Sequence, residues 1–380
     1  MAHVVILGGG FGGLAAVETL RATLGDSVDI TLVDRNDRFF MGFAKLWDLG
    51  GIRPLEEGTT PLARLADRGV EFVQADITAI DPEARRVETS AGTLEADALL
   101  VALGAPNNPS HRRLLQAPGA HDLYDAASLP AIHQALDTIE SGRILVALLG
   151  MPFKCPPAPF EAVLIVDEVL RRRGVRDQVQ VSISTFQPMT LPVAGVDASQ
   201  YVARQLGDHG IELLSGHTVA GVDDGVVRFE DGSTFGFDVL LGVPAASPPP
   251  VVKQSPLAGP NGWIQPDRQT LRTGFDRVYA VGDCTMVPTA NAQLPKAGVF
   301  AAAEGEVAAR NIAADLGTGG GATFDGHGFC FLELPGRRVA YVEGNFFAEP
   351  APAVALSEAD ESRFARKQAY ERERIAAWLG

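Results

Sequence analysis

The chain has 380 residues, of which 46% are hydrophobic, and this length predicts two domains plus an appendage around a sizeable interior. Its net charge of -15 argues against nucleic-acid binding and gives no general attraction to anionic lipid. The first residues lack a secretory-signal pattern, no apolar run is long enough to span a membrane, and three cysteines are too few for a disulfide scaffold. These features predict a cytoplasmic globular protein.

The opening stretch predicts a nucleotide-binding turn. An apolar run over residues 3–7 is typical of a buried strand, and a glycine-rich segment then begins an apolar helix. Gly8, Gly10 and Gly13 have the G-x-G-x-x-G spacing. The first glycine permits a tight turn, the second a close approach of a pyrophosphate, and the third close packing of helix on strand. The pyrophosphate would lie at the positive end of the helix dipole.

A second predicted strand, residues 28–34, supports this interpretation. It ends in Asp34, about 20 residues after the glycines, where a carboxylate is expected to bind a ribose hydroxyl. Residues 35–41 are polar and then aromatic, which suits a loop passing over a cofactor. An ordinary glycine-rich strand–helix turn is the alternative.

Further along, the pattern alternates between strands and helices. The first part predicts a short helix over 61–67, a strand over 70–77 and a β-meander over 85–102. The middle part predicts strands at 142–150, 179–186, 211–214 and 219–237, with helices at 159–173 and 199–209. After a breaker at 245–250, we expect a strand at 277–281, a helix over 297–316, strands at 328–333 and 338–343, a loop, and a last helix from about Ser357.

These elements predict three units. Residues 1–104 and 251–325 would form a discontinuous nucleotide-binding domain, and residues 105–250 a second domain of the same kind. Residues 326–380 would form a small C-terminal α+β segment.

Three segments carry a resemblance to a known family: the Gly8–Gly13 turn, residues 98–104, and Tyr279-Ala280-Val281-Gly282-Asp283. Over nearly its whole length the chain resembles the flavoproteins with two dinucleotide-binding domains, which include disulfide reductases, type II NADH dehydrogenases and sulfide:quinone oxidoreductases. Leu103 departs from the threonine usual in the family. The resemblance implies an α/β fold with two Rossmann-like domains of the glutathione-reductase type.

The resemblance also implies FAD as the cofactor, with the Asp283 carboxylate accepting hydrogen bonds from the ribityl hydroxyls. A helix N-cap is the alternative role for Asp283. The residues assigned to the FAD site are Gly8, Gly10, Phe11, Gly13, Asp34, Arg35, Ile77, Gly104, Gly282, Asp283 and Lys296.

The second domain lacks the glycine loop that an NAD(P)H-binding member has. After the strand ending at Gly150, the segment 151–161 carries prolines and Phe153 where glycines are expected. Because proline has no N–H to donate to a phosphate, this segment argues against a nicotinamide nucleotide as reductant.

The segment Lys154-Cys155-Pro156-Pro157-Ala158-Pro159-Phe160-Glu161 resembles the active-site segment of sulfide:quinone oxidoreductases. It looks closer still to that of the flavin subunit of flavocytochrome c sulfide dehydrogenase. The resemblance implies that Cys155 pairs with a C-terminal cysteine beside the flavin, for which Cys330 is the candidate. Many of these enzymes have a third cysteine earlier in the second domain, and this chain has none there.

The chemistry of sulfide oxidation suits such a pair. Hydrosulfide would attack the disulfide and leave a persulfide and a free thiolate. We expect a lowered pKa for Cys155, because it precedes a predicted helix N-terminus and follows Lys154. The alternatives are a half-buried free thiol for Cys155 and a core strand residue for Cys330; Cys284 is expected to pack near the cofactor.

Two further side chains are candidates for catalysis. Glu161 is expected either to accept a proton from hydrogen sulfide or to interact with the helix dipole. Lys296 would stabilise the anionic reduced flavin, with an exposed first-turn lysine as the alternative. None of the histidines and cysteines has zinc-ligand spacing, so no metal is predicted.

The electron acceptor is the least determined feature. The last helix carries Ile375, Trp378 and Leu379 on one side, which suits either an interfacial membrane helix or docking on the protein or a partner. The sequence therefore predicts an FAD-dependent sulfide oxidoreductase that passes electrons to quinone, cytoplasmic or peripheral on the inner face of the cell membrane, with a homodimer left open. The alternatives are a flavin subunit that donates to a cytochrome c, a non-catalytic redox-sensing flavoprotein, and an NADH-dependent reductase.

Overall fold

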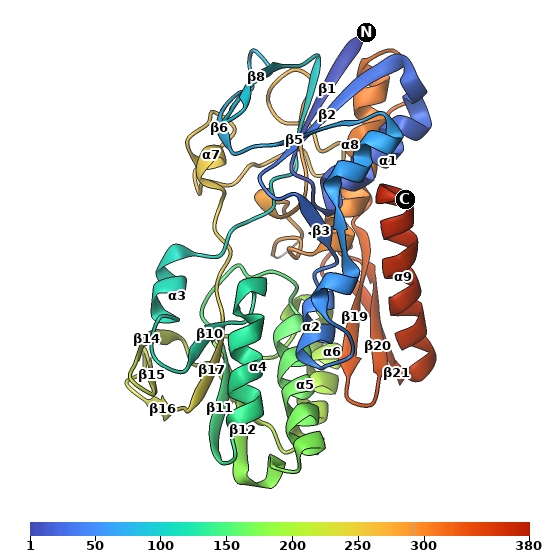
Figure 1. Cartoon of the computed structure of the whole chain (residues 1–380). Helices are drawn as coiled ribbons and strands as arrows, with labels where there is room; N and C mark the ends of the chain where they lie inside the picture. The colour runs from blue at the N-terminus through green and yellow to red at the C-terminus, as the bar shows by residue number, and fades with distance from the viewer. Residues whose placement is uncertain (291) are drawn as a thin grey trace.

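The structure, a computed structural model, describes residues 1–290 and 292–380. Two parallel five-stranded sheets lie one above the other in Figure 1, and a C-terminal antiparallel sheet with a long helix lies beside them. No helix of the described residues is long and apolar enough to cross a membrane.

The first parallel sheet combines strands from both segments of the predicted nucleotide-binding domain, residues 1–104 and 251–325. Its order is β18-β9-β1-β2-β5, formed by β18 (Val278–Ala280), β9 (Ala98–Val101), β1 (Ala2–Leu7), β2 (Val28–Asp34) and β5 (Glu71–Gln74). On one face, α1 (Phe11–Leu24) and α8 (Gly298–Asp315) pack against each other. The other face is covered by the meander β6 (Ile77–Asp81), β7 (Arg86–Thr89) and β8 (Gly92–Glu95), with α7 (Pro250–Lys253). Burial on both faces explains the continuous apolar runs of these strands.

The second parallel sheet has the order β10-β17-β11-β12-β13. Its strands are β10 (Ala120–Asp122), β17 (Val239–Val243), β11 (Gly142–Leu148), β12 (Val179–Thr185) and β13 (Glu212–Ser215). One face carries α4 (Leu129–Thr138), α5 (Ala158–Arg173) and α6 (Gly195–Asp208). The opposite face carries β14 (Val219–Asp223), β15 (Val226–Phe229) and β16 (Thr234–Gly236), and α3 (Pro109–Leu114) precedes β10.

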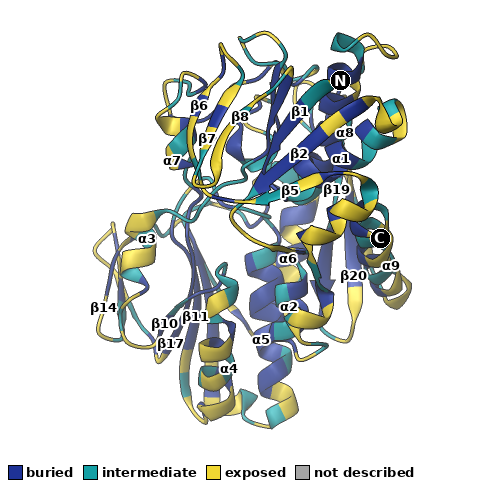
Figure 2. Cartoon of the chain, turned by 45° about the horizontal axis from the view of Figure 1, so that its top comes forward, coloured by how far each residue is buried: buried dark blue, intermediate teal, exposed yellow. Residues whose placement is uncertain are grey.

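The two sheets are joined by more than their linkers. The hairpin-like pair β3 (Arg38–Phe40) and β4 (Thr59–Pro61) flanks α2 (Ala44–Leu49), which packs on α4 and α5 of the second sheet. Figure 2 shows α5 buried along most of its length behind α2 and α4. An N-terminal segment thereby becomes one wall of the space between the sheets.

The C-terminal segment forms the sheet β19 (His327–Leu334), β20 (Arg338–Asn345) and β21 (Ala353–Asp360), followed by α9 (Glu361–Leu379). The expectation of a loop and a helix from about Ser357 is wrong, because residues 353–360 pair with β20 as an edge strand. The charged residues of this strand do not alternate with apolar ones regularly enough to reveal it. The domain boundaries at 104, 250 and 325 stay predictions.

Candidate active site

The three glycines of the opening turn have three different surroundings. Gly8 has φ +111°, and a Cβ there would lie 2.3 Å from the Ala102 carbonyl oxygen. A Cβ on Gly13 would lie 1.9 Å from the Gly8 oxygen, whereas one on Gly10 would meet no atom within 4 Å. The turn and the close packing predicted for the first and third glycines are therefore present. Open space lies at the second glycine, where a pyrophosphate would pass.

The N-terminus of α1 keeps its donors free for an anion. Its N-cap, Gly10, provides no side-chain hydrogen bond, and no acid lies in the first turn. The Asp34 carboxylate accepts from the Gly9 N–H at 2.7 Å and from the Asn36 N–H at 2.8 Å. Asp34 therefore stabilises the turn and also borders the space beside it.

Most of the predicted site residues line one cavity of about 370 Å³ between the two sheets. It brings together Gly10, Phe11, Asp34, Gly104, Gly282, Asp283 and Lys296 with Cys155, Glu161 and Cys330. Arg35 and Ile77 instead line an adjoining cavity of about 900 Å³, which also borders Asp34. Gly8 and Gly13 line neither cavity and act through packing.

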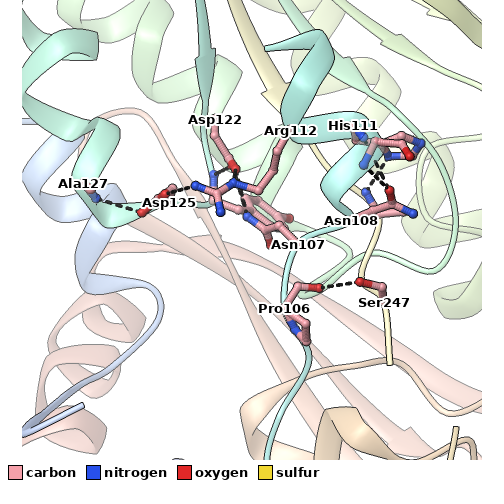
Figure 3. A network of polar contacts seen from close by, with 12 residues as sticks. Pro106, Asn107, Asn108, His111, Arg112, Asp122, Asp125, Ala127 and Ser247 are labelled. Carbon is pink, nitrogen blue, oxygen red and sulfur yellow. Dashed lines mark hydrogen bonds and ion pairs between the residues drawn. The ribbon is translucent and has the colours of Figure 1, made fainter. Parts of the chain in front are cut away.

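The adjoining cavity has a polar wall on the second domain. Arg112 lies 3.0 Å from an Asp125 oxygen and 3.7 Å from an Asp122 oxygen, and the Asn107 amide donates to both Asp122 oxygens (Figure 3). The same Asp122 accepts from the Tyr124 N–H at 2.9 Å. This network fixes the start of the segment that carries Tyr124 toward the first cavity.

The polar groups around the first cavity fit FAD. No described hydrogen bond uses the Asp283 carboxylate; burial raises its pKa, and the charges of Lys296 and Lys154 oppose that rise. The unbonded Asp283 carboxylate suits the hydroxyl-rich ribityl chain, as the uncapped α1 terminus suits the pyrophosphate. When bound, FAD would be held by this set.

Lys296 is not an exposed first-turn residue. Its side chain is buried, and its Nζ donates to the carbonyl oxygens of Asp283, at 2.8 Å, and Thr285, at 2.9 Å. The ammonium also lies 3.7 Å from the centre of the Trp263 ring. Burial lowers its pKa, while the Asp283 charge acts in the opposite direction. Lys296 precedes α8, whose first turn has neither a side-chain cap nor an acid. This arrangement directs positive charge into the cavity.

The backbone of Cys155 is held firmly against the FAD-side segment. Cys155 has φ +48°, a region that non-glycine residues rarely adopt. Its N–H donates to the Lys296 carbonyl at 2.7 Å, and its own carbonyl accepts from the Ala158 N–H at 2.9 Å. The Tyr124 hydroxyl donates to the Lys154 carbonyl at 2.7 Å. The loop before α5 is thereby fixed to the opposite wall of the cavity.

The expected lowering of the Cys155 pKa is wrong. Burial raises this pKa well above its usual range, and the charge of Glu161 adds to the rise. The Lys154 ammonium donates to the Ala105 carbonyl at 3.1 Å. The desolvation of the thiolate therefore outweighs the helix N-terminus that follows it.

The second candidate cysteine lies on β19 and lines the same cavity. Burial raises the pKa of Cys330 to about 12. Both Cys155 and Cys330 are free thiols in the structure, so the disulfide between them stays a prediction. Cys284 is fully buried, with its thiol 3.3 Å from the Val281 carbonyl, and does not line the cavity.

Glu161 belongs to a buried charge network that the sequence did not reveal. Its Oε1 lies 3.2 Å from Lys367 Nζ, which also lies 2.7 Å from Glu333 Oε2. The same Glu333 oxygen accepts from the Trp47 indole N–H at 2.8 Å. Burial raises the pKa of Glu161, and the positive charge of Lys367 opposes that rise. Burial lowers the pKa of Lys367, but the charges of the two carboxylates outweigh it, so that pKa is raised. Elements α2, α5, β19 and α9 therefore meet in one ionic cluster.

The place where an NAD(P)H-binding member would hold its phosphates is filled. The N–H of Ala158 is already bonded to Cys155, and the preceding residues 156 and 157 are prolines. A Cβ on Gly150 would lie 2.7 Å from the His111 ring, which covers the end of β11. The loop before α5 therefore offers few free N–H donors to the phosphates of a nicotinamide nucleotide.

The last helix docks on the protein itself. Trp378 is fully buried, with its ring 5.7 Å from those of Phe11 and Phe39. Leu379 is also in this core, which includes side chains of α1. Of the two alternatives for the apolar side of this helix, docking on the protein accounts for Trp378 and Leu379, two of its three apolar residues.

Comparison with known proteins gives the family. A family profile described as pyridine nucleotide-disulphide oxidoreductase matches residues 2–149 and 167–305, more than half of the chain. The chain belongs to this family. It is an FAD-dependent oxidoreductase, as predicted.

Individual relatives are more distant. The chain is 24% identical over 379 residues to the mitochondrial sulfide:quinone oxidoreductase of Dictyostelium discoideum, covering 95% of this chain and 81% of that protein. It is 27% identical to the sulfide-quinone reductase of Aquifex aeolicus, covering 83% and 76%, and 25% identical to a type II NADH:quinone oxidoreductase of Staphylococcus aureus, covering 81% of each.

A solved structure supports the fold. The sulfide:quinone oxidoreductase from Aquifex aeolicus superposes with a TM-score of 0.87 at 22% identity, covering 98% of this chain and 90% of that one. An NAD-dependent persulfide reductase from A. fulgidus gives 0.70 at 21% identity, covering 90% and 64%. The expected α/β fold with two Rossmann-like domains is confirmed.

Proposed function

We propose that the protein oxidises sulfide, or a persulfide, to sulfane sulfur or polysulfide and passes the electrons through FAD to quinone. The observation that carries the proposal is the meeting of Cys155 and Cys330 in the cavity of Asp283 and Lys296. The two cysteines come from distant segments, the loop before α5 and strand β19. Relatives named sulfide:quinone oxidoreductase support the same reaction.

The sulfur chemistry requires the two cysteines as a disulfide. Hydrosulfide attacks one sulfur of the pair, a new S–S bond forms, the Cys–Cys bond breaks, and the second cysteine leaves as a thiolate. Over the full reaction each hydrosulfide gives one sulfane sulfur, one proton and two electrons. FAD, held by the residues around Asp283 and Lys296, would supply the two-electron acceptor between the sulfur and the quinone, which takes up two protons.

Two cavity side chains support these steps. Glu161 faces the cavity with a pKa raised by burial, which suits it to accept the proton that sulfide releases. Lys296, between the Asp283 and Thr285 carbonyls, provides the positive charge near the reduced cofactor.

The quinone would reach the cavity beside the C-terminal segment. Phe329, Phe331 and Tyr370 line the cavity from β19 and α9. Aromatic side chains provide the apolar surface that a quinone ring requires.

Turnover with alternative reductants tests this function. FAD-loaded protein is mixed with a soluble ubiquinone analogue and either sulfide or NADH, and quinone reduction is followed. We expect steady reduction with sulfide and none with NADH. Turnover with NADH and none with sulfide would overturn the proposal.

A further inference from the structure

The lysines of the chain are concentrated in one place. The chain has 32 lysines and arginines, and only five of them are lysines. Four line the cavity that holds the two cysteines, namely Lys45, Lys154, Lys296 and Lys367. The fifth, Lys253, is exposed on α7. The other residues among the 32 are arginines. Four of the five lysine ammonium groups therefore lie around this one cavity.

Two of the four cavity lysines each have two polar partners in the protein. Lys367 lies between Glu161 and Glu333, and the Lys296 ammonium donates to two backbone carbonyls. Lys45 and Lys154 differ from them. Neither has an ion-pair partner within the described residues, and each makes one described hydrogen bond, to the carbonyls of Tyr124 at 2.8 Å and Ala105 at 3.1 Å. An ammonium has three N–H donors, so each retains donors for a ligand.

Lys45 and Lys154 line the cavity together with Cys155. Lys154 directly precedes Cys155, and Lys45 on α2 is close enough that the charges of Lys154 and Cys155 both act on it. Tyr124 connects them, because its carbonyl accepts from Lys45 while its hydroxyl donates to the Lys154 carbonyl.

The Tyr124 segment is itself held in place. Its N–H donates to Asp122, whose carboxylate is fixed by Asn107 and Arg112 in the network of Figure 3. Asp122 and Asp125 also act on the charges of both lysines without forming an ion pair with either. The two ammonium groups are therefore positioned by protein contacts but not neutralised by them.

We propose that Lys45 and Lys154 bind the anionic sulfur substrate, hydrosulfide or a hydropersulfide, beside Cys155. The terminal anionic sulfur of either ion presents no flat pair of oxygens to a guanidinium, so the compact ammonium suits it better than arginine does. The binding site rests on the proposed function, and it adds the residues that hold the substrate before it attacks the disulfide.

The test uses FAD-loaded protein and anaerobic rapid mixing with increasing sulfide. Lys45→Met removes the charge with nearly the same length of side chain, and Lys253→Met is the matched control on the surface. We expect Lys45→Met to raise the half-saturating sulfide concentration about tenfold, with little change in the limiting rate of flavin reduction. Photoreduction, which needs no sulfide, should reduce both variants equally.

A second measurement needs no variant. In the wild-type protein, thiocyanate, an inert monovalent anion, should raise the half-saturating sulfide concentration by competition. Equal half-saturation in Lys45→Met and Lys253→Met, or no competition by thiocyanate, would overturn the substrate site while leaving the proposed function standing. A wild-type flavin that sulfide does not reduce at all would overturn the proposed function and the substrate site together.

Discussion

Lys367 and Glu161 are 206 positions apart in the chain, yet their Nζ and Oε1 atoms lie 3.2 Å from each other in the interior. Lys367 comes from the last helix and Glu161 from the helix that follows Cys155. Glu333, three residues after Cys330, completes the cluster. The C-terminal helix thus holds the counter-ion for both carboxylates that flank the cysteine pair.

Removing that counter-ion should be costly. Lys367→Met leaves two buried carboxylates without a cation, and we expect a loss of roughly 3–5 kcal/mol in the free energy of unfolding. Urea denaturation measures it, with Lys253→Met as the exposed control. A Lys367→Met protein as stable as that control would contradict the role of the cluster.

The docking of α9 makes a separate prediction. Trp378 is fully buried against Phe11 and Phe39, and Phe11 lines the cavity. Trp378→Ala should cost roughly 3–5 kcal/mol and weaken retention of FAD. The exposed Arg372→Ala on the same helix is the control, and both quantities can be followed by thermal unfolding and flavin fluorescence. Unchanged stability would mean that this side of α9 is not packed on the core.

Glu304 should make stability depend on pH. Burial raises its pKa from 4.5 to about 7, and its Oε2 accepts from the Gly282 N–H at 2.6 Å. The folded protein therefore keeps the Glu304 carboxyl protonated to a higher pH than the unfolded chain does. Because ionisation then favours the unfolded chain, the free energy of unfolding falls as the pH rises from about 4.5 toward 7. Glu304→Gln, whose amide oxygen can still accept from Gly282, avoids this loss.

We expect Glu304→Gln to be more stable than the wild type at pH 8 by roughly 3 kcal/mol, on the basis of about 1.4 kcal/mol for each pKa unit. The difference should close as the pH falls toward 4.5. Denaturant titrations at several pH values measure it. A constant difference across this range would contradict the raised pKa.

The proposed substrate site predicts its own pH dependence. Burial and the nearby charge of Lys154 lower the pKa of Lys45 to about 8, while Asp122, Cys155 and Asp125 act in the opposite direction. The ammonium is charged below this pH and neutral above it. The half-saturating sulfide concentration of the wild type should therefore rise above pH 8, and that of Lys45→Met, which keeps only Lys154, should rise less. Parallel pH profiles for the two proteins would contradict the assignment.

The sequence predicts those parts of the site whose chemistry is local. Gly8, Gly10 and Gly13 follow one another in one turn, so their spacing alone indicates which glycine must turn, approach a ligand or pack. Cys155 and Asp283 could be singled out because short motifs surround them.

Other parts depend on contacts between distant segments. Lys45 lies on a short helix of the first domain that packs on the second, and Lys367 and Glu333 meet Glu161 only after the C-terminal segment folds over α5. No local pattern encodes these contacts. The scarcity of lysine was the one available signal, since four of the five lysines line a single cavity.

The pKa of Cys155 illustrates the same limit. The residues before and after it indicate a helix N-terminus and a neighbouring lysine, which lower a thiol pKa. The burial that raises this pKa comes from the surrounding segments, as does the Glu161 charge. A local motif could therefore not give the direction of the shift.

The most direct measurement of the central claim is anaerobic reduction of the bound flavin by sulfide. We expect sulfide to bleach the visible flavin band of the wild-type protein and of Cys284→Ala, whose cysteine lies outside the cavity. Cys155→Ser and Cys330→Ser should retain FAD but lose this bleaching. A wild-type flavin that stays oxidised in sulfide, or bleaching that survives in Cys155→Ser, would contradict it.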